Sequence, residues 1–81
     1  MFTLTIYLFA FPREKLNKST VTHHFTTSKN IAEIINFLLE EYPGIPFNKY
    51  RYAIGKKYMT DMSFVVDKDT ELYVIPPISG G

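Results

Sequence analysis

The chain has 81 residues, 46% of them hydrophobic, and a net charge of +1, which fit one domain with a single core and give no electrostatic basis for binding nucleic acid or an anionic membrane. It contains no cysteine, which excludes disulfides, a thiolate metal site and a cysteine nucleophile. Because no stretch approaches the roughly 18 apolar residues of a membrane span, and the first residues lack the basic region of a signal peptide, we expect a cytoplasmic protein.

Two strands are predicted in the first part of the chain. Residues 2–11 place apolar or β-forming side chains on both alternating faces, which is typical of a central strand, and Pro12 ends the run. Residues 13–18 are polar and are expected to form a loop. Residues 19–27 are rich in Thr and predict a second strand, which can pair with the first as a hairpin.

A three-turn amphipathic helix is predicted next. Its apolar residues recur at helical spacing: Ile31, Ile34, Ile35, Leu38, Leu39 and Tyr42. Asn30 and Glu33 have the spacing of a capping box at the start, and Pro43-Gly44 ends the helix.

Three further short strands are predicted in the second half of the chain. They cover residues 50–54, 58–60 and 71–75. Residues 61–65 are expected to wander or to make one helical turn, so that the order of elements is ββαβββ. Because one helix can bury its apolar stripe only against a sheet, the sequence predicts an α+β domain in which a mixed sheet of about five strands packs on one main helix.

A sheet covered by one helix leaves its second face open. If the alternate residues of the first and last strands point at the helix, Tyr7, Phe9, Tyr73 and Ile75 lie on this open face. Exposed apolar and aromatic area of this kind indicates contact with a partner protein, so we expect these four residues to form a partner-docking surface.

Two groups of polar residues give weaker indications of function. His23 and His24 are adjacent on a predicted strand, so they point to opposite faces and do not share an ion, and no metal site is predicted. A basic cluster surrounds the 55–57 turn, and its members are Lys49, Arg51, Lys56 and Lys57. It either solvates an edge strand against unwanted pairing or steers an acidic partner surface, and we favour the first interpretation.

The C-terminal segment is the most informative stretch of the sequence. It reads Pro76, Pro77, Ile78, Ser79, Gly80 and Gly81. The two prolines stop the last strand and stiffen the chain, whereas the two glycines lack a Cβ and are slim enough for a narrow channel. We therefore expect a domain over residues 1–77 and a flexible tail over residues 78–81, whose working group is the carboxylate of Gly81. The plain alternative is a frayed terminus with no role.

These residues resemble a known family, the small subunit of molybdopterin synthase, which is a ubiquitin-like sulfur carrier with the β-grasp fold. The ending is similar to the Pro-Pro-Val-Ser/Thr-Gly-Gly terminus of that family, and Phe9-Ala10 followed by Arg13-Glu14 resembles its Phe-Ala-x-x-Arg-Glu signature. The chain departs from the family in two turns. Asp69-Thr70-Glu71 stands where Gly-Asp-Glu is frequent, and Ala53-Ile54-Gly55 stands in place of Ala-Val-Asn.

The resemblance implies a specific role. Gly81 would be adenylated by an ATP-dependent, ubiquitin-activating-like adenylyltransferase and converted to a thiocarboxylate, and residues 76–80 would insert into the large subunit of the synthase. Large and small subunits of the synthase would form a heterotetramer, which would pass the sulfur to a pyranopterin precursor of the molybdenum cofactor. The chain would hold no permanent cofactor, since the activating enzyme uses the ATP, and it would not be an enzyme by itself.

Three alternatives remain from the sequence. In the first, the chain is a sulfur carrier for thiamine, cysteine or tRNA thiolation, which keeps the activation and changes the acceptor. In the second, it is a protein modifier that forms isopeptide bonds to lysines. In the third, it is an interaction module whose tail has no function.

Overall fold

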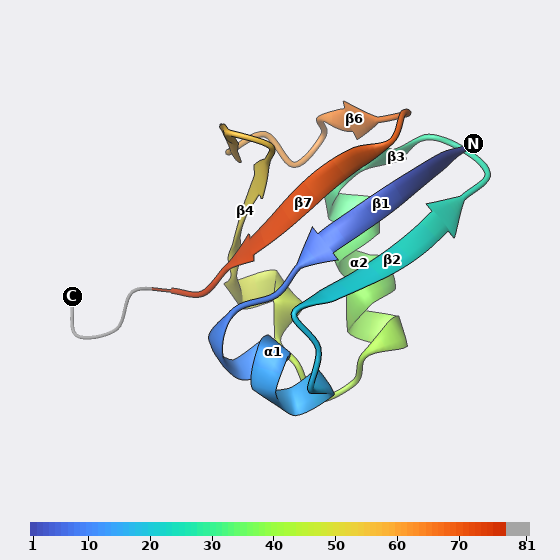
Figure 1. The fold of residues 1–81 in the computed structure, drawn as a ribbon. Coiled ribbons are helices and arrows are strands. Elements are labelled where there is room, and N and C mark those ends of the chain that lie inside the picture. The colour runs from blue at the N-terminus through green and yellow to red at the C-terminus, as the bar shows by residue number, and fades with distance from the viewer. Residues whose placement is uncertain (78–81) are drawn as a thin grey trace.

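A mixed five-stranded sheet forms the frame of the protein, as the computed structural model of residues 1–77 shows (Figure 1). Its strands are β1 (Phe2–Tyr7), β2 (Thr20–Phe25), β4 (Arg51–Ile54), β5 (Lys57–Met59) and β7 (Thr70–Ile75). They lie in the order β2-β1-β7-β4-β5, with β1 and β7 parallel and the other neighbours antiparallel. The predicted sheet is thereby confirmed, and the last strand occupies its centre.

The helix α2 (Ile31–Glu41) covers one face of this sheet (Figure 1). Its side chains Ile31, Ile34 and Leu38 are fully buried. They meet a sheet layer of equally buried residues, which includes Phe2, Leu4, Ile6, Leu72 and Val74. Each such side chain stabilises the fold by about 1.5–3 kcal/mol relative to an exposed position. The apolar stripe of α2 and its packing against a sheet confirm the predicted α+β architecture.

The start of α2 is held by more partners than the sequence indicates. The predicted capping box is present, since the Glu33 N–H donates to Asn30 Oδ1 at 2.8 Å and the Asn30 N–H donates to Glu33 Oε1 at 2.9 Å. In addition, the N–H groups of Ile31 and Ala32 donate to carbonyls of the 61–64 turn. This turn precedes β6 (Val65–Val66), which pairs with β3 (Lys29–Asn30) in a second, two-stranded sheet.

The predictions of a strand up to residue 11 and of a loop over residues 13–18 are wrong. The strand β1 ends at Tyr7, and a helix, α1 (Ala10–Leu16), follows it. Pro12 lies in the first turn of α1, where a missing N–H costs no helical hydrogen bond. The helix ends at Asn17, which adopts the left-handed conformation with φ of 55°, and its last carbonyls accept N–H groups of the following residues.

A short 3-10 helix, η1 (Phe47–Lys49), connects α2 to β4. The buried Tyr52 on β4 donates its hydroxyl to the Phe47 carbonyl at 2.6 Å, and burial raises the pKa of this tyrosine. Gly44 precedes η1 with φ of 97°, a conformation that favours glycine. Within residues 1–77, no helix has the length and apolar character needed to cross a membrane.

Candidate functional site

The site predicted from the sequence begins where the chain leaves the sheet. β7 ends at Ile75, the half-buried Pro76 and the exposed Pro77 follow, and the chain departs from the body at this end (Figure 1). β7 is hydrogen-bonded to β1 up to Tyr73 and to β4 up to Ile75, so the residue before Pro76 is held by its pairing with Arg51 on β4. Ile78, Ser79, Gly80 and Gly81, which carry the predicted chemistry, lie outside the described residues.

Two tyrosines lie side by side on the open face next to this exit. Tyr7 on β1 is the register partner of Tyr73 on β7, and their rings stack with centroids 4.7 Å apart and planes 12° apart. Both hydroxyls donate to the carboxylate of Glu71, at 3.1 Å from Tyr7 and 3.2 Å from Tyr73. The Glu71 hydrogen bond raises the pKa of Tyr7, and burial together with the Glu71 charge raises the pKa of Tyr73. Both tyrosines therefore stay neutral, in fixed positions.

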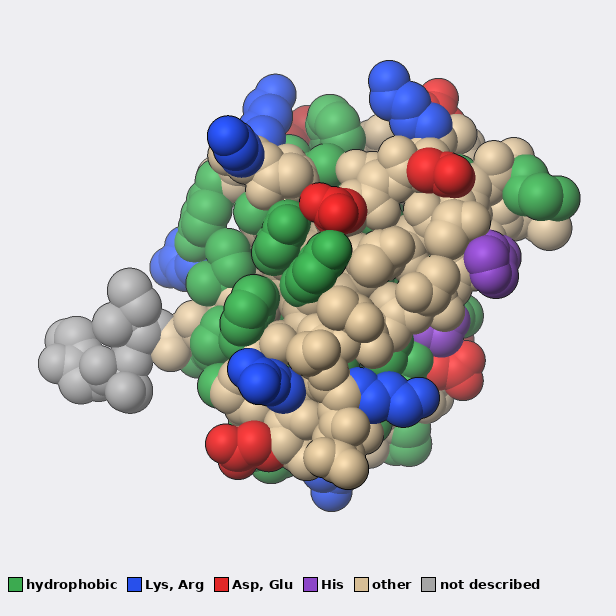
Figure 2. All heavy atoms as spheres, in the orientation of Figure 1, with side chains coloured by type: hydrophobic (Ala, Val, Ile, Leu, Met, Phe, Trp, Pro, Cys, Tyr) green, Lys and Arg blue, Asp and Glu red, His purple; other side chains and the backbone are tan. Residues whose placement is uncertain are grey.

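These tyrosines belong to a row that crosses the sheet. Tyr73 is also paired with Ala53 on β4, and Ala53 is paired with Tyr58 on β5. We call Tyr7, Tyr73, Ala53 and Tyr58 the tyrosine row. Figure 2 views this open face and shows hydrophobic side chains gathered over the β7 and β4 side. The sequence alone did not indicate Tyr58, because its place depends on which strands are neighbours.

The other two residues expected on the docking surface lie in different settings. Ile75 is half-buried at the end of β7, two residues beyond Tyr73 and on the same face. Phe9 is 41% exposed, but it precedes α1 instead of standing on a strand, so it is not part of the tyrosine row.

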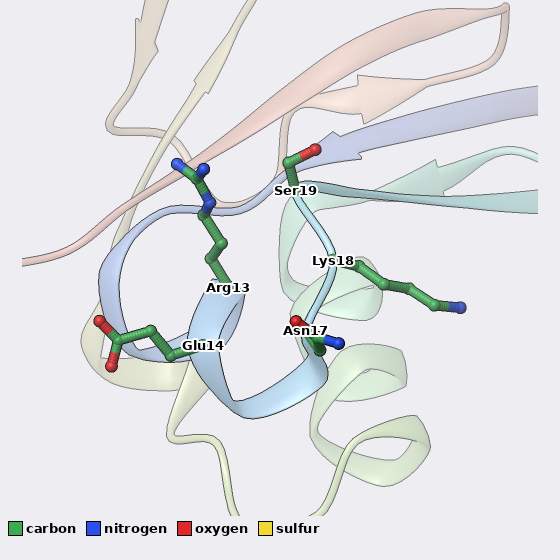
Figure 3. A pocket seen from close by; sticks show the side chains of 5 residues that line it. All are labelled: Arg13, Glu14, Asn17, Lys18 and Ser19. Atoms are coloured by element: carbon green, nitrogen blue, oxygen red, sulfur yellow. The ribbon is translucent and has the colours of Figure 1, made fainter.

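Among the hollows on the surface of residues 1–77, two have similar volumes. One, of about 340 Å³, lies at the base of the tail and is lined by Arg51, Tyr58, Ile75, Pro76 and Pro77. The other, of about 320 Å³, lies between α1 and β2 and is lined by Arg13, Glu14, Asn17, Lys18 and Ser19. In the second, Arg13 extends towards the sheet whereas Lys18 points away from it, so the two cations do not converge (Figure 3).

The histidines have structural partners of their own. His23 Nε2 shares a hydrogen bond of 2.6 Å with the Tyr42 hydroxyl on the helix side of β2, and His24 Nδ1 shares one of 2.9 Å with Thr3 Oγ1 on the other face. Their opposite directions are as predicted. In the part of the chain that the structure describes, no group of three His, Asp or Glu side chains is placed to hold a metal ion.

Comparison with known proteins gives a consistent result. The sequence model of the ThiS family matches residues 6–81. Among solved structures, SAMP1 from Haloferax volcanii is 18% identical with a TM-score of 0.75, and the match covers 98% of this chain and 99% of that one. A Pyrococcus furiosus protein assigned as molybdopterin converting factor subunit 1 is 11% identical with a TM-score of 0.78, covering 96% and 100%. Small archaeal modifier protein 1 from Methanosarcina acetivorans is 16% identical with a TM-score of 0.77, covering 100% and 98%. At these identities the structural likenesses establish the β-grasp fold.

Proposed function

The chain belongs to the ThiS family of ubiquitin-like sulfur carriers, and we propose that it carries sulfur as a thiocarboxylate on Gly81. The observation that supports this is the ending Pro-Pro-Ile-Ser-Gly-Gly, which directly follows the central strand β7. This strand is paired with β4 up to its last residue, Ile75, which gives the tail a defined starting point and direction. The two prolines extend that direction, and the two glycines fit a narrow partner channel.

The chemistry has two steps, because a carboxylate is a poor electrophile. In an adenylating enzyme, an oxygen of the Gly81 carboxylate attacks the α-phosphorus of ATP and pyrophosphate leaves. Hydrosulfide or a persulfide then attacks the acyl carbon, and AMP leaves with the bonding electrons. Where a persulfide attacks, a thiol reductant then cleaves the resulting acyl disulfide to give the thiocarboxylate. The carrier contributes its terminus to both steps and the partners contribute the catalytic groups, so it is a subunit in the reaction and not a catalyst by itself.

We further propose that the sulfur acceptor is a pyranopterin precursor of the molybdenum cofactor. The Pro76–Gly81 ending supports this acceptor, as does the likeness to the molybdopterin converting factor subunit from Pyrococcus furiosus. In this role the tail enters the large subunit of molybdopterin synthase, within a heterotetramer. The ATP belongs to the activating enzyme and is not held by the carrier.

Docking of the body has to offset the cost of ordering the tail. Fixing four residues in a channel costs about 4–8 kcal/mol at roughly 1–2 kcal/mol per residue. The tyrosine row lies beside the tail exit, and aromatic side chains are frequent at the centres of interfaces. We propose that the tyrosine row and Ile75 form the docking surface, with Phe9 at its margin.

A second candidate function is protein modification. It is favoured by the likeness to the two archaeal modifier proteins, which share the fold at comparable TM-scores. In this case a lysine amine of a target protein attacks the acyl carbon of the Gly81 adenylate, AMP leaves, and an isopeptide bond forms. Sulfur delivery for thiamine, cysteine or tRNA thiolation keeps the thiocarboxylate and changes only the acceptor.

A gene deletion separates the molybdenum cofactor function from protein modification. In a strain that lacks the gene for this chain, we expect the molybdenum cofactor content to fall to background. The wild-type gene should restore it, and a gene without the Gly81 codon should not. Unchanged cofactor content in the deletion strain, together with loss of Gly81-dependent protein conjugates, would instead support the modifier function.

A further inference from the structure

The hollow at the base of the tail combines one cation with apolar walls. Arg51 begins β4, is exposed, and is the register partner of Ile75 on β7. The remaining walls are Tyr58, Pro76 and Pro77. No acidic residue occurs between positions 49 and 60, a segment that contains four cations. The hollow therefore presents a positive charge beside apolar surface.

This arginine lies at the end of an otherwise interior strand. The edge of the sheet on this side is β5, whereas β4 is hydrogen-bonded to β7 and to β5. A charge against unwanted strand pairing is useful on Lys57, which is in the edge strand. The pairing of β4 with β5 begins at Tyr52, so Arg51 is paired with Ile75 on the β7 side only, and its side chain lines the hollow at the base of the tail. Protection of this strand end and a role in the hollow are both compatible with this position, and the kinetic test separates them.

The length of the tail brings any receiving protein to this hollow. Four residues follow Pro77. At full extension they span at most about 14 Å, since a residue adds roughly 3.3–3.6 Å. A partner that encloses Gly81 in its active site must therefore approach the carrier within that distance of Pro77. Because Pro77 lines the hollow, the hollow lies inside or at the border of the interface with such a partner.

We propose that this hollow receives an Asp or Glu side chain of the adenylating enzyme, which pairs with Arg51. A guanidinium matches a carboxylate in a bidentate geometry, and the surrounding proline and tyrosine surfaces exclude water and strengthen the pair. The methylene groups of the acidic side chain pack on Pro76 and Pro77. The pair fixes the register of the tail at the mouth of the partner channel, and the inference rests on the proposed function.

The kinetic test uses the full-length carrier, its adenylating enzyme and ATP–pyrophosphate exchange. For Arg51→Glu we expect the KM for the carrier to rise at least about tenfold, because two carboxylates then meet, with kcat within about twofold. Lys56→Glu changes the net charge equally but stands in the turn at the opposite end of β4, and its KM should stay within about twofold. Arg51→Gln, which keeps a polar side chain of similar length, should give an intermediate KM. Circular dichroism establishes that each variant is folded.

A cross-link identifies the contact directly. In the R51K variant, a zero-length carbodiimide should join residue 51 to an Asp or Glu of the adenylating enzyme, whereas the native Lys56 should remain unlinked. The proposal is overturned if R51E and K56E have the same KM as the wild type, or if residue 51 is not linked in a mixture that still adenylates Gly81. A wild-type carrier that is not adenylated at all overturns the proposed function itself.

Discussion

Tyr7 and Tyr73 stack at 4.7 Å across the parallel pairing of β1 with β7, and the two hydroxyls share the Glu71 carboxylate. This arrangement joins the first and last strands of the sheet beside the exit of the tail. Because both rings are already held in place, a partner that docks on them loses little side-chain entropy. This aromatic surface lies beside the end of β7, where the proposed function requires partners to dock.

The first prediction concerns this surface. Tyr73→Ala removes the central ring of the tyrosine row, and we expect the affinity for the adenylating enzyme to fall at least about tenfold, as for a central interface aromatic. Titration calorimetry measures the affinity. Thr22→Ala is the matched control, since Thr22 is exposed on the same face but over the edge strand β2. Equal affinities of the Tyr73→Ala variant and the wild type would contradict a docking role for this face.

The second prediction tests the capping box of α2. Asn30→Ala removes the acceptor of the Glu33 N–H, and we expect the free energy of unfolding to fall by about 1 kcal/mol. Asn36→Ala makes the same chemical change at an exposed position inside the helix, where alanine is the better helix former. That variant should be as stable as the wild type or slightly more stable. Urea unfolding measures both, and a larger loss for Asn36→Ala would refute the assignment of the cap.

The third prediction concerns pH. Burial lowers the pKa of His23 from its ordinary value of 6.5, with His24 acting in the same direction and Glu41 opposing both. The imidazole of His23 therefore binds a proton more readily in the unfolded chain than in the folded protein. The stabilisation from neutral His23 is fully present above pH 6.5, and it is lost as the pH falls below that value.

Urea unfolding at a series of pH values measures this effect. His23→Gln should lose less stability than the wild type between neutral pH and pH 5, because it cannot take up the proton. His24→Gln keeps the burial of His23 and its bond to Tyr42, and removes only the smallest cause of the pKa shift, so its profile should lie closer to that of the wild type than the profile of His23→Gln does. Identical profiles for His23→Gln and the wild type would show that His23 does not control this loss.

The periodic parts of the fold were predictable from the sequence. The stripe from Ile31 to Tyr42 and the Asn30–Glu33 spacing located α2, because both signals depend on neighbours within one or two helical turns. Helix α1 was missed, since Pro12 breaks a strand but is equally at home in the first turn of a helix. The two-residue strands β3 and β6 are too short to show a period.

The candidate site was predictable only in part. The places of Tyr7 and Tyr73 on the open face followed from alternation within their own strands, whereas the role of residues 78–81, which is inferred from their composition, stays a prediction. The contributions of Tyr58 and Arg51 depend on β4 lying between β7 and β5, a tertiary relationship that no local pattern encodes. The alternation over residues 2–11 predicts that Phe9 lies on the sheet, but β1 ends at Tyr7, before Phe9.

The most direct test of the account is the intact mass of the chain after incubation with its adenylating enzyme, ATP and a sulfur donor. We predict that the wild-type mass rises by the difference between sulfur and oxygen, and that a chain without Gly81 shows no rise. ATP–pyrophosphate exchange by the same enzyme establishes that it is active with the wild-type carrier. An unchanged wild-type mass under conditions in which that exchange proceeds would contradict the conclusion that Gly81 carries sulfur.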